Sequence, residues 1–163
     1  MNVAVISDTH LPRGTRRIPE ACLERLRTAD LILHAGDVTA ASVLDELEEL
    51  GPPVHAVHGN MDDGTLQARL AATLVVDVGG PKVAMTHDAG PRAGREERLA
   101  ARFPGCAAVV YGHTHEPQVA RVGATTWILN PGSPTERRRA PSHTMLVLEV
   151  VAGTISPELI QLS

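Results

Sequence analysis

The sequence predicts an α/β protein in which two β-sheets, with parallel and antiparallel strands mixed, are flanked by helices. The first half of the chain alternates short β-branched runs with helical patterns, whereas the second half carries mainly short strand patterns separated by turns. The length of 163 residues fits a single domain over residues 1–163 with a substantial core. The chain has one Trp, one Tyr and one Phe, so this core must consist of aliphatic side chains.

The first half predicts strands and helices in strict alternation. Strands are expected at residues 2–6, 31–34 and 54–57, and helices at 19–28 and 40–50. Pro19 suits the first turn of its helix, and Gly51-Pro52-Pro53 ends the next one. This order implies parallel strands joined by right-handed crossovers.

The second half predicts mainly strands. Strands at 73–78 and 82–86 flank the turn Gly79-Gly80-Pro81, and a helix at 92–102 precedes the apolar run Ala107 to Tyr111. Short strand patterns follow at residues 117–122, 125–129, 143–151 and 154–161. Glycine-containing dipeptides between them suit hairpin turns. The chain is therefore expected to end as an antiparallel meander.

The composition indicates a protein of the cytoplasm. No stretch approaches the ~20 apolar residues of a membrane helix, and the N-terminus lacks the charged start and cleavage site of a signal peptide. The formal net charge of −4 argues against a broad basic face for nucleic acid. Cys22 and Cys106 form no CxxC pair and lie in apolar or helical contexts, which predicts two buried free thiols.

Polar side chains that can bind metals follow five of the expected strands, directly after each strand ends. In an open α/β sheet the ligand site lies beyond the carboxyl ends of the strands, so these loops can converge. Each motif alone is also typical of a turn or a helix cap, whereas the ordered set is specific. The candidate ligands are Asp8, His10, Asp37, Asn60, His87, His113 and His115.

The chemistry of this set points to divalent cations. Two aspartates brought together would repel each other, and several neutral imidazoles would lack partners, unless a cation lies between them. Mixed oxygen and nitrogen donors suit Mn, Fe, Co, Ni or Zn better than Mg or Ca. Seven donors are too many for one tetrahedral ion and about right for two ions with open positions. His34 and His58 lie near these motifs, and packing is the favoured role for both.

The same ordered set resembles the calcineurin-like metallophosphoesterases. The phrase Asn130-Pro131-Gly132-Ser133 and the short chain resemble the small prokaryotic phosphodiesterase branch of that family. The resemblance runs from Met1 to about Leu148. It implies a two-sheet sandwich flanked by helices, in four layers (α/β/β/α), with two metals at one edge of the sheets.

The resemblance also implies a role for each candidate ligand. One metal would be held by Asp8, His10 and His115, a second by Asn60, His87 and His113, and Asp37 would bridge the two. A hydroxide between the metals would attack phosphorus in line with the leaving alcohol, with Asp37, Asn60 and His113 as the catalytic residues. The expected cofactors are two divalent ions, with Mn favoured and Ni, Fe, Zn or Co as alternatives.

Three positions bear on the substrate. Larger members of the family carry a His after the Asn, where it protonates the leaving group, and this chain has Met61 there. Activity should therefore favour esters with good leaving groups. Asp88 follows His87 and is expected either to support a ligand histidine or to lie in the loop. Arg137 and Arg138 are candidates for substrate contact alongside Asn60, although a charge run is often a solvated loop.

Small phosphate esters, and diesters before monoesters, are the expected substrates. Two other function classes are kept as alternatives. One eukaryotic relative of the small branch, a retromer subunit, resembles these enzymes in fold yet serves as a protein-binding scaffold. A nuclease is the other, against which the net charge and the scarcity of aromatic side chains argue. Neither extended nucleic acid nor a membrane is an expected partner, and the sequence leaves open whether the chain forms a homo-oligomer.

Overall fold

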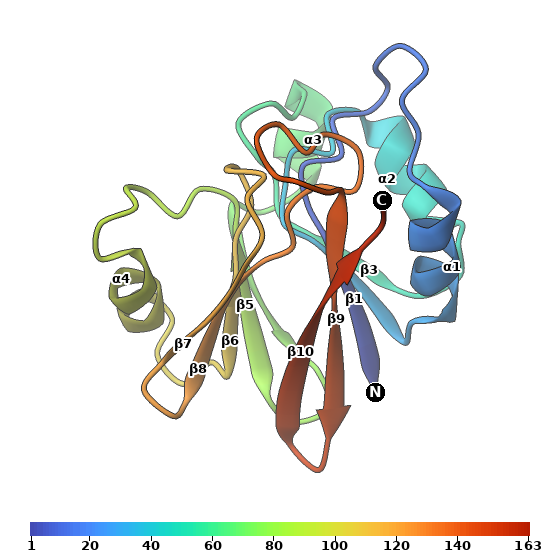
Figure 1. Cartoon of the computed structure of the whole chain (residues 1–163). Helices are drawn as coiled ribbons and strands as arrows, with labels where there is room; N and C mark the ends of the chain where they lie inside the picture. Colours follow the sequence, from blue (N-terminus) through green and yellow to red (C-terminus); the bar gives the residue numbers. More distant parts are fainter.

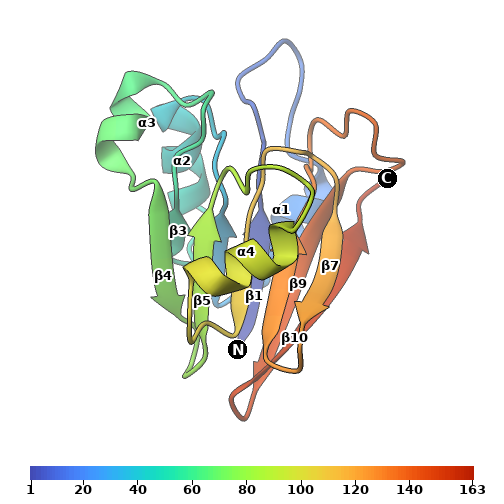
Figure 2. The same cartoon turned by 90° about the vertical axis from the view of Figure 1, so that its left-hand side faces the viewer.

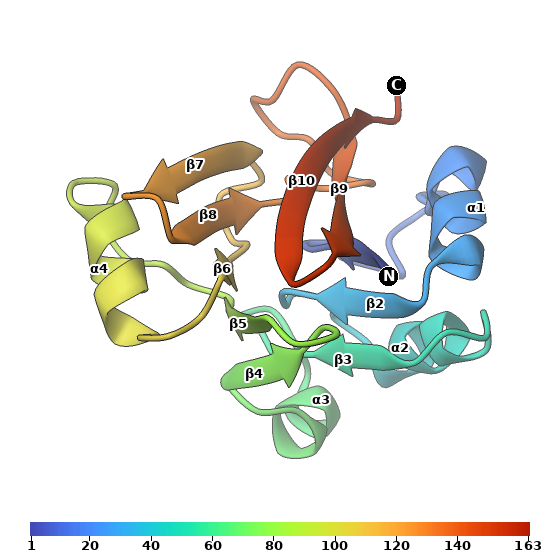
Figure 3. The same ribbon diagram turned by 90° about the horizontal axis from the view of Figure 1, so that it is seen from below.

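Two five-stranded sheets stacked face to face form the centre of the computed structural model, which describes all 163 residues (Figure 1). The strand orders are β10-β9-β1-β2-β3 and β4-β5-β6-β8-β7. Helices cover the outer faces of both sheets, as the view from below shows (Figure 3). This arrangement confirms the predicted fold class of two mixed sheets flanked by helices.

The first sheet joins both ends of the chain. Strands β1 (Asn2–Ile6), β2 (Leu31–His34) and β3 (Val54–Ala56) are parallel neighbours, as the alternating pattern predicts. The hairpin of β9 (Thr144–Val151) and β10 (Thr154–Gln161) completes the sheet, because β9 pairs antiparallel with β1.

The second sheet is built from the middle of the chain. Strands β4 (Thr73–Asp77) and β5 (Lys82–Thr86) form an antiparallel pair, and β6 (Ala108–Val110) runs parallel to β5. Strand β8 (Thr126–Asn130) is parallel to β6 and antiparallel to β7 (Gln118–Val122), which forms the edge.

The predicted antiparallel meander at the end of the chain is wrong. Strands β8 and β9 lie in different sheets, so the last hairpin extends the first sheet instead of continuing the second. Met145 and Leu146 are adjacent in β9 and both fully buried, which fits a strand covered on its two faces. The alternation of residues indicates a strand but does not identify the strand with which it pairs.

Four helices flank the sheets: α1 (Glu20–Thr28), α2 (Ala41–Glu48), α3 (Gly64–Arg69) and α4 (Arg95–Arg102). In α1, Cys22 and Leu26 pack on the outer face of the first sheet. Helix α4 covers the second sheet through Leu99 (Figure 2). The sequence reading missed α3, which has only six residues and begins where the Asp63 side chain accepts a hydrogen bond from the Leu66 N–H (2.9 Å).

Aliphatic side chains from both sheets fill the space between them, as expected. In β1, Val3 and Val5 point into this core, whereas Ala4 and Ile6 point toward α1, because alternate residues of a strand face opposite sides. Cys22 and Cys106 are buried free thiols, as predicted. None of the helices has both the length and the apolar character needed to cross a membrane.

Candidate metal centre

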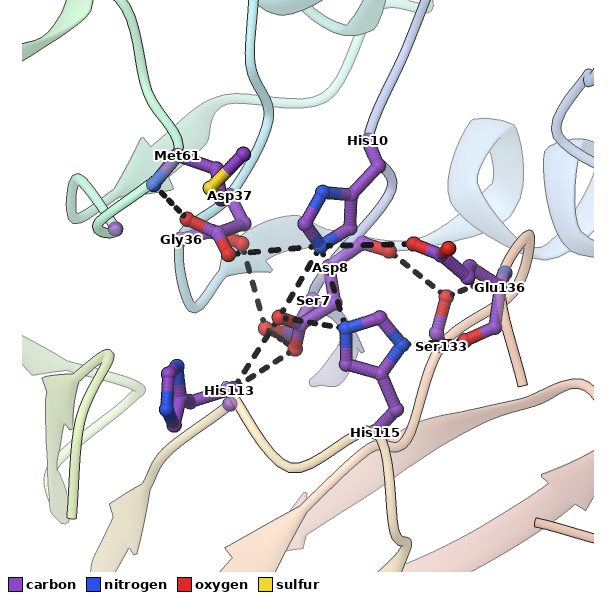
Figure 4. Close-up of polar contacts among 12 residues, drawn as sticks. Ser7, Asp8, His10, Gly36, Asp37, Met61, His113, His115, Ser133 and Glu136 are labelled. Carbon is purple, nitrogen blue, oxygen red and sulfur yellow. Dashed lines mark hydrogen bonds and ion pairs between the residues drawn. The ribbon is translucent and has the colours of Figure 1, made fainter. Parts of the chain in front are cut away.

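Asp8, His10 and His115 form a first cluster of possible metal ligands. Asp8 Oδ1 lies 3.4 Å from His115 Nε2 and 3.7 Å from His10 Nε2. The two Nε2 atoms are 3.2 Å apart. All three side chains are buried, and their donor atoms point toward one another in the close-up view (Figure 4). The loops after β1 and β6 therefore converge at one edge of the two sheets.

A second cluster lies beside the first and contains His87, Asn60 and His113. Asn60 Oδ1 is 3.1 Å from His87 Nε2 and 3.1 Å from His113 Nδ1. Asp37 lies between the clusters, since its Oδ2 is 3.2 Å from His87 Nε2 and 3.5 Å from His10 Nε2. The structure thus brings all seven predicted ligands together, with one carboxylate placed between two groups of donors.

The backbone of the ligand loops is held in an unusual conformation. Positive φ angles occur at Asp8 (56°), His10 (46°), Asp37 (57°), His113 (71°) and His115 (62°). Non-glycine residues adopt this region rarely, and such strain concentrates at functional sites, where the surroundings enforce it. Five of the seven candidate ligands have a positive φ angle. The fold therefore directs these side chains toward the centre at a cost in local backbone stability.

Two motif glycines are required because other groups approach them closely. A Cβ on Gly59 would lie 2.1 Å from Asp37 Oδ1, and a Cβ on Gly112 would lie 2.1 Å from Ser7 Oγ and 2.7 Å from Asp8 Oδ2. No side chain fits in either position. The glycines that precede Asn60 and His113 therefore let the backbone approach the two aspartates.

The protons on the histidines show that the site fits a cation. The Nδ1 atoms of His87 and His115 face the carbonyl oxygens of Ala35 and Glu136, which only accept hydrogen bonds, so both Nδ1 atoms carry protons. Wherever Nε2 carries no second proton, its lone pair faces a carboxylate oxygen. Such contacts repel unless a cation or a second proton lies between the atoms. Carbonyl groups that fix ligand histidines in this way are typical of metal sites.

The electrostatics of the site couple the aspartates to the histidines. Burial alone would raise the pKa of Asp8, but His10, His115 and His87 around it hold the pKa well below its usual range. The pKa of Asp37 is lowered too, because His87 and the Met61 N–H offset the effect of burial. Burial lowers the pKa of His87, but Asp37 and Asp8 more than offset this and raise it to about 8. Negative charge is thus retained where a cation would bind.

The centre is buried on one side and open on the other. Asp8, Asp37 and His115 are inaccessible, whereas Asn60 and His113 are exposed, and Met61 beside them is 58% exposed. A pocket of about 430 Å³ adjoins this open side and is lined by Asn60, His87, Thr86, Arg102 and other polar residues. A ligand can therefore reach Asn60 and His113 of the second cluster directly, whereas the side chains of the first cluster are buried.

Several residues that support the site were not singled out from the sequence. The Asp62 carboxylate accepts the N–H groups of Asp37 (3.1 Å), Thr39 (2.6 Å) and Gly59 (2.6 Å), which joins two of the ligand loops. Ser133 Oγ donates to the Asp8 carbonyl at 2.8 Å. Ser133 belongs to the Asn130–Ser133 phrase and Asp62 to the polar motif Gly59-Asn60-Met61-Asp62 after the third strand, so the sequence held a signal for both but not for the groups that they contact.

His34 is buried beneath the centre and outside both clusters. Its Nδ1 accepts the Gly36 N–H at 3.2 Å, so Nε2 carries the proton and donates to the Thr9 hydroxyl at 3.1 Å. Burial lowers the pKa of His34 to about 4, which keeps the ring neutral. It therefore helps to hold Thr9, which lies between the candidate ligands Asp8 and His10 in the chain. His58 lines the open pocket beside Asn60.

The proposed substrate contacts are placed as follows. Arg137 donates to the Ala140 carbonyl at 2.9 Å within its own loop, and Arg138 reaches the His113 carbonyl at 3.4 Å. Only Arg138 of this pair thus contacts a candidate ligand residue. Asp88 accepts the Gly90 N–H at 2.8 Å, so it stabilises its own turn.

Comparisons with known proteins find relatives of this chain in sequence and in fold. A sequence model described as the calcineurin-like phosphoesterase superfamily domain matches residues 1–153. The chain is 36% identical over 167 residues to a probable metallophosphoesterase of Methanothermobacter thermautotrophicus, which covers 99% of this chain and 92% of that protein. A Zn²⁺ complex of Vps29 from Entamoeba histolytica is similar over the whole of both chains, with 28% identity and a TM-score of 0.74. An archaeal phosphodiesterase shares the fold, with a TM-score of 0.74, 21% identity, and coverage of 98% of this chain and 100% of that chain.

Proposed function

The chain belongs to the calcineurin-like phosphoesterase superfamily, and on this premise we propose that it is a phosphodiesterase that uses two divalent cations. The observation that carries the proposal is the position of Asp37, whose Oδ2 lies within 3.5 Å of His10 Nε2 and within 3.2 Å of His87 Nε2. A carboxylate so placed can bind two cations at once. The remaining donors then divide into one group for each cation.

The donor set determines which cations fit. Imidazole and carboxylate together suit Mn²⁺, with Ni²⁺, Fe²⁺, Zn²⁺ and Co²⁺ as alternatives. Zn²⁺ in the Vps29 complex of E. histolytica supports this choice of metal class. A bound pair of cations lowers the pKa of water toward ~7 and offsets negative charge on phosphate oxygens. Side chains of the protein would then orient the ester relative to the cations.

Asn60 and His113 are the ligands that a phosphate ester meets first. Both are exposed at the open side of the centre, and Asn60 Oδ1 lies 3.1 Å from each neighbouring histidine nitrogen. The Asn60 amide N–H groups are then free to donate to a phosphate oxygen. Arg138 lies at the same side through its contact with the His113 backbone and is the better candidate of the two arginines for the phosphate.

The leaving group departs without a proton donor at position 61. Met61 is 58% exposed beside Asn60 and has no proton to transfer. Esters of acidic alcohols, such as phenols, therefore suit the site better than alkyl esters. Arg102 is the one arginine or lysine that lines the open pocket of about 430 Å³, which favours the singly charged diester over a doubly charged monoester.

A protein-binding scaffold is the second candidate, because the similar structures include Vps29, by its name a vacuolar protein sorting protein. Its Zn²⁺ complex means that metal binding by itself does not distinguish the two functions. A scaffold does not need complementary donors at all seven positions, nor five strained ligand residues to aim them inward. Both features are present in this chain and favour catalysis.

The test is hydrolysis of bis-p-nitrophenyl phosphate and p-nitrophenyl phosphate by metal-stripped protein after addition of each cation. We expect Mn²⁺-dependent turnover, faster on the diester, that Asp37→Ala abolishes. Asp77→Ala is the matched control, since Asp77 is an exposed aspartate at the end of β4 that accepts only the Gly79 and Gly80 N–H groups of its own turn, and it should keep full activity. Absence of both turnover and cation binding would instead support the scaffold, whereas two bound cations without turnover of either ester would indicate a narrower substrate or a regulatory metal site.

A further inference from the structure

The open pocket beside the second cluster is lined almost entirely by polar groups. Of its nine lining residues only Ala72 is hydrophobic, and none is Phe, Tyr or Trp. Asn60 and His87 connect the pocket to the candidate metal ligands. Gln67 lines it from α3, and Arg102 lines it from the last turn of α4. A substituent of a phosphate ester bound at the second cluster can therefore extend into a polar space of about 430 Å³.

Two opposite charges line this pocket and do not pair with each other. Arg102 stacks on the Phe103 ring, 5.1 Å from its centroid, and makes one hydrogen bond within the chain, to Thr86 Oγ1 at 3.4 Å. Asp88 accepts the Gly90 N–H through Oδ1 at 2.8 Å. Neither side chain belongs to an ion pair. Most N–H groups of the guanidinium and Oδ2 of the carboxylate are thus left for a ligand or for water.

The charges of the pocket select the kind of substituent that fits. An anionic substituent would be attracted by Arg102 but repelled by Asp88, and a cationic one would meet the reverse, so the pair favours a neutral group. A guanidinium only donates hydrogen bonds and a carboxylate only accepts them, whereas a hydroxyl group does both. Hydroxyl groups therefore satisfy both side chains, while an apolar group would displace their water and leave them without partners.

We propose that this pocket binds a neutral, hydroxyl-bearing substituent of a phosphodiester, and that Arg102 and Asp88 determine this specificity. The inference rests on the proposed phosphodiesterase function and names the class of its substrate. An aliphatic alcohol leaves slowly from a site whose Met61 has no proton to give, so the hydroxylated substituent is the one that stays on phosphorus. Water then forms the new P–O bond, the bond to the more acidic alcohol breaks, and the products are that alcohol and the monoester of the hydroxylated group.

The experiment compares two diesters that release the same p-nitrophenol. The substituent that stays on phosphorus is glyceryl in one ester and propyl in the other, and the rate with Asp37→Ala protein is subtracted from each. Both esters carry one negative charge, so the ratio of their kcat/KM values reports on the hydroxyl groups and not on the leaving group or the charge. We expect the unmodified chain with Mn²⁺ to prefer the glyceryl ester by about 10-fold, as for one added hydrogen bond to a charged group.

Variants at the two charged positions test the assignment. Arg102→Gln and Asp88→Ala should each bring the ratio of the two kcat/KM values toward unity. An effect of the Arg102 charge at a distance would lower both values equally and leave the ratio unchanged. Arg121→Gln is the matched control, because Arg121 is also exposed and stacked on an aromatic ring, 4.7 Å from the Trp127 centroid, but lies on β7 outside the pocket. It should keep the ratio of the unmodified chain.

An unmodified chain that hydrolyses the two esters equally well, or the propyl ester faster, would overturn the inference. A preference for the glyceryl ester that survives in both Arg102→Gln and Asp88→Ala would overturn it as well. Either result would leave the proposed phosphodiesterase function in place. No metal-dependent turnover of these two esters or of bis-p-nitrophenyl phosphate would instead count against the proposed function itself.

Discussion

Replacing Gly59 by alanine should damage the centre through a single added carbon. The new Cβ would lie 2.1 Å from Asp37 Oδ1 and 2.6 Å from the Asp37 backbone nitrogen. Since Cβ contacts under 3.0 Å essentially never occur, the carboxylate oxygen must retreat by at least 0.9 Å, the difference between 3.0 and 2.1 Å. Metal sites tolerate deviations of only about 0.2 Å in ligand distance. Oδ2 of the same carboxylate lies between the two clusters. Displacement of the carboxylate should therefore prevent Asp37 from binding a cation of each cluster.

The same displacement should also destabilise the protein without metal. Overpacking a tight site costs about 1–3 kcal/mol, and the Met61 N–H loses the carboxylate that accepts it at 2.8 Å. An orphaned polar group costs about 1–3 kcal/mol more if it stays buried. We therefore expect the free energy of unfolding to fall by about 2–6 kcal/mol.

Urea unfolding of metal-stripped protein and calorimetric titration with Mn²⁺ measure the two effects. Gly64→Ala is the matched control, because a Cβ there meets nothing within 4 Å and Gly64 is the first residue of α3. Alanine is favoured over glycine in helices by about 1 kcal/mol, so Gly64→Ala should equal or exceed the unmodified protein in stability. A Gly59→Ala protein that unfolds within about 0.5 kcal/mol of the unmodified one, and binds two cations normally, would refute the reasoning.

Three further predictions follow from single histidines and from Met61. The pKa of His87 is raised from its ordinary value of 6.5 to about 8 in the folded protein. Protonated His87 therefore stabilises the metal-free protein fully below pH 6.5, and this stabilisation is lost as the pH rises through 8. A cation must displace that proton, so Mn²⁺ affinity should fall as the pH drops from 8 to 6.5, with proton release visible by calorimetry in buffers of different ionisation enthalpy; equal release at pH 6.5 and pH 9 would contradict this. The pKa of His34 is lowered to about 4, so between pH 6.5 and 4 the unfolded chain takes up a proton that the folded chain does not. His34→Gln should therefore reduce the loss of stability between pH 7 and pH 5 in urea unfolding, and an unchanged loss would exclude this cause. Met61→His supplies a proton donor at an exposed position, and general acid catalysis predicts a gain of about 10-fold or more on an alkyl ester relative to an aryl ester; a ratio of rates that does not move would argue against a proton donor at position 61.

The sequence determined most of the elements because their signals are local. The β-branched run at residues 2–6 and the apolar run before Gly112 predict β1 and β6 without knowledge of their partners. The candidate ligands were also predictable, because parallel strands end at one edge and the polar residues after each strand must gather there. A resemblance to a known family then assigned these ligands to two metals.

Short or non-local features could not be predicted in this way. Helix α3 has six residues, which is too short for a 3.6-residue period to be visible, and the Asp63 side chain that caps it resembles any turn residue. The role of Asp62 depends on amide groups from two other loops. Such hydrogen bonds exist only when the loops are already side by side.

The tertiary structure alone decided which sheet the last hairpin joins and which carboxylates face the centre. Strand β9 pairs with β1, more than 140 residues away in the chain, and this pairing brings the loop with Ser133 and Glu136 over Asp8 and His10. Strand propensity measures how well a residue fits a pleated surface, and it carries no information about the identity of the neighbouring strand. The sequence thus specified the ligands that follow each strand, while the pairing of distant strands placed Glu136 beside them.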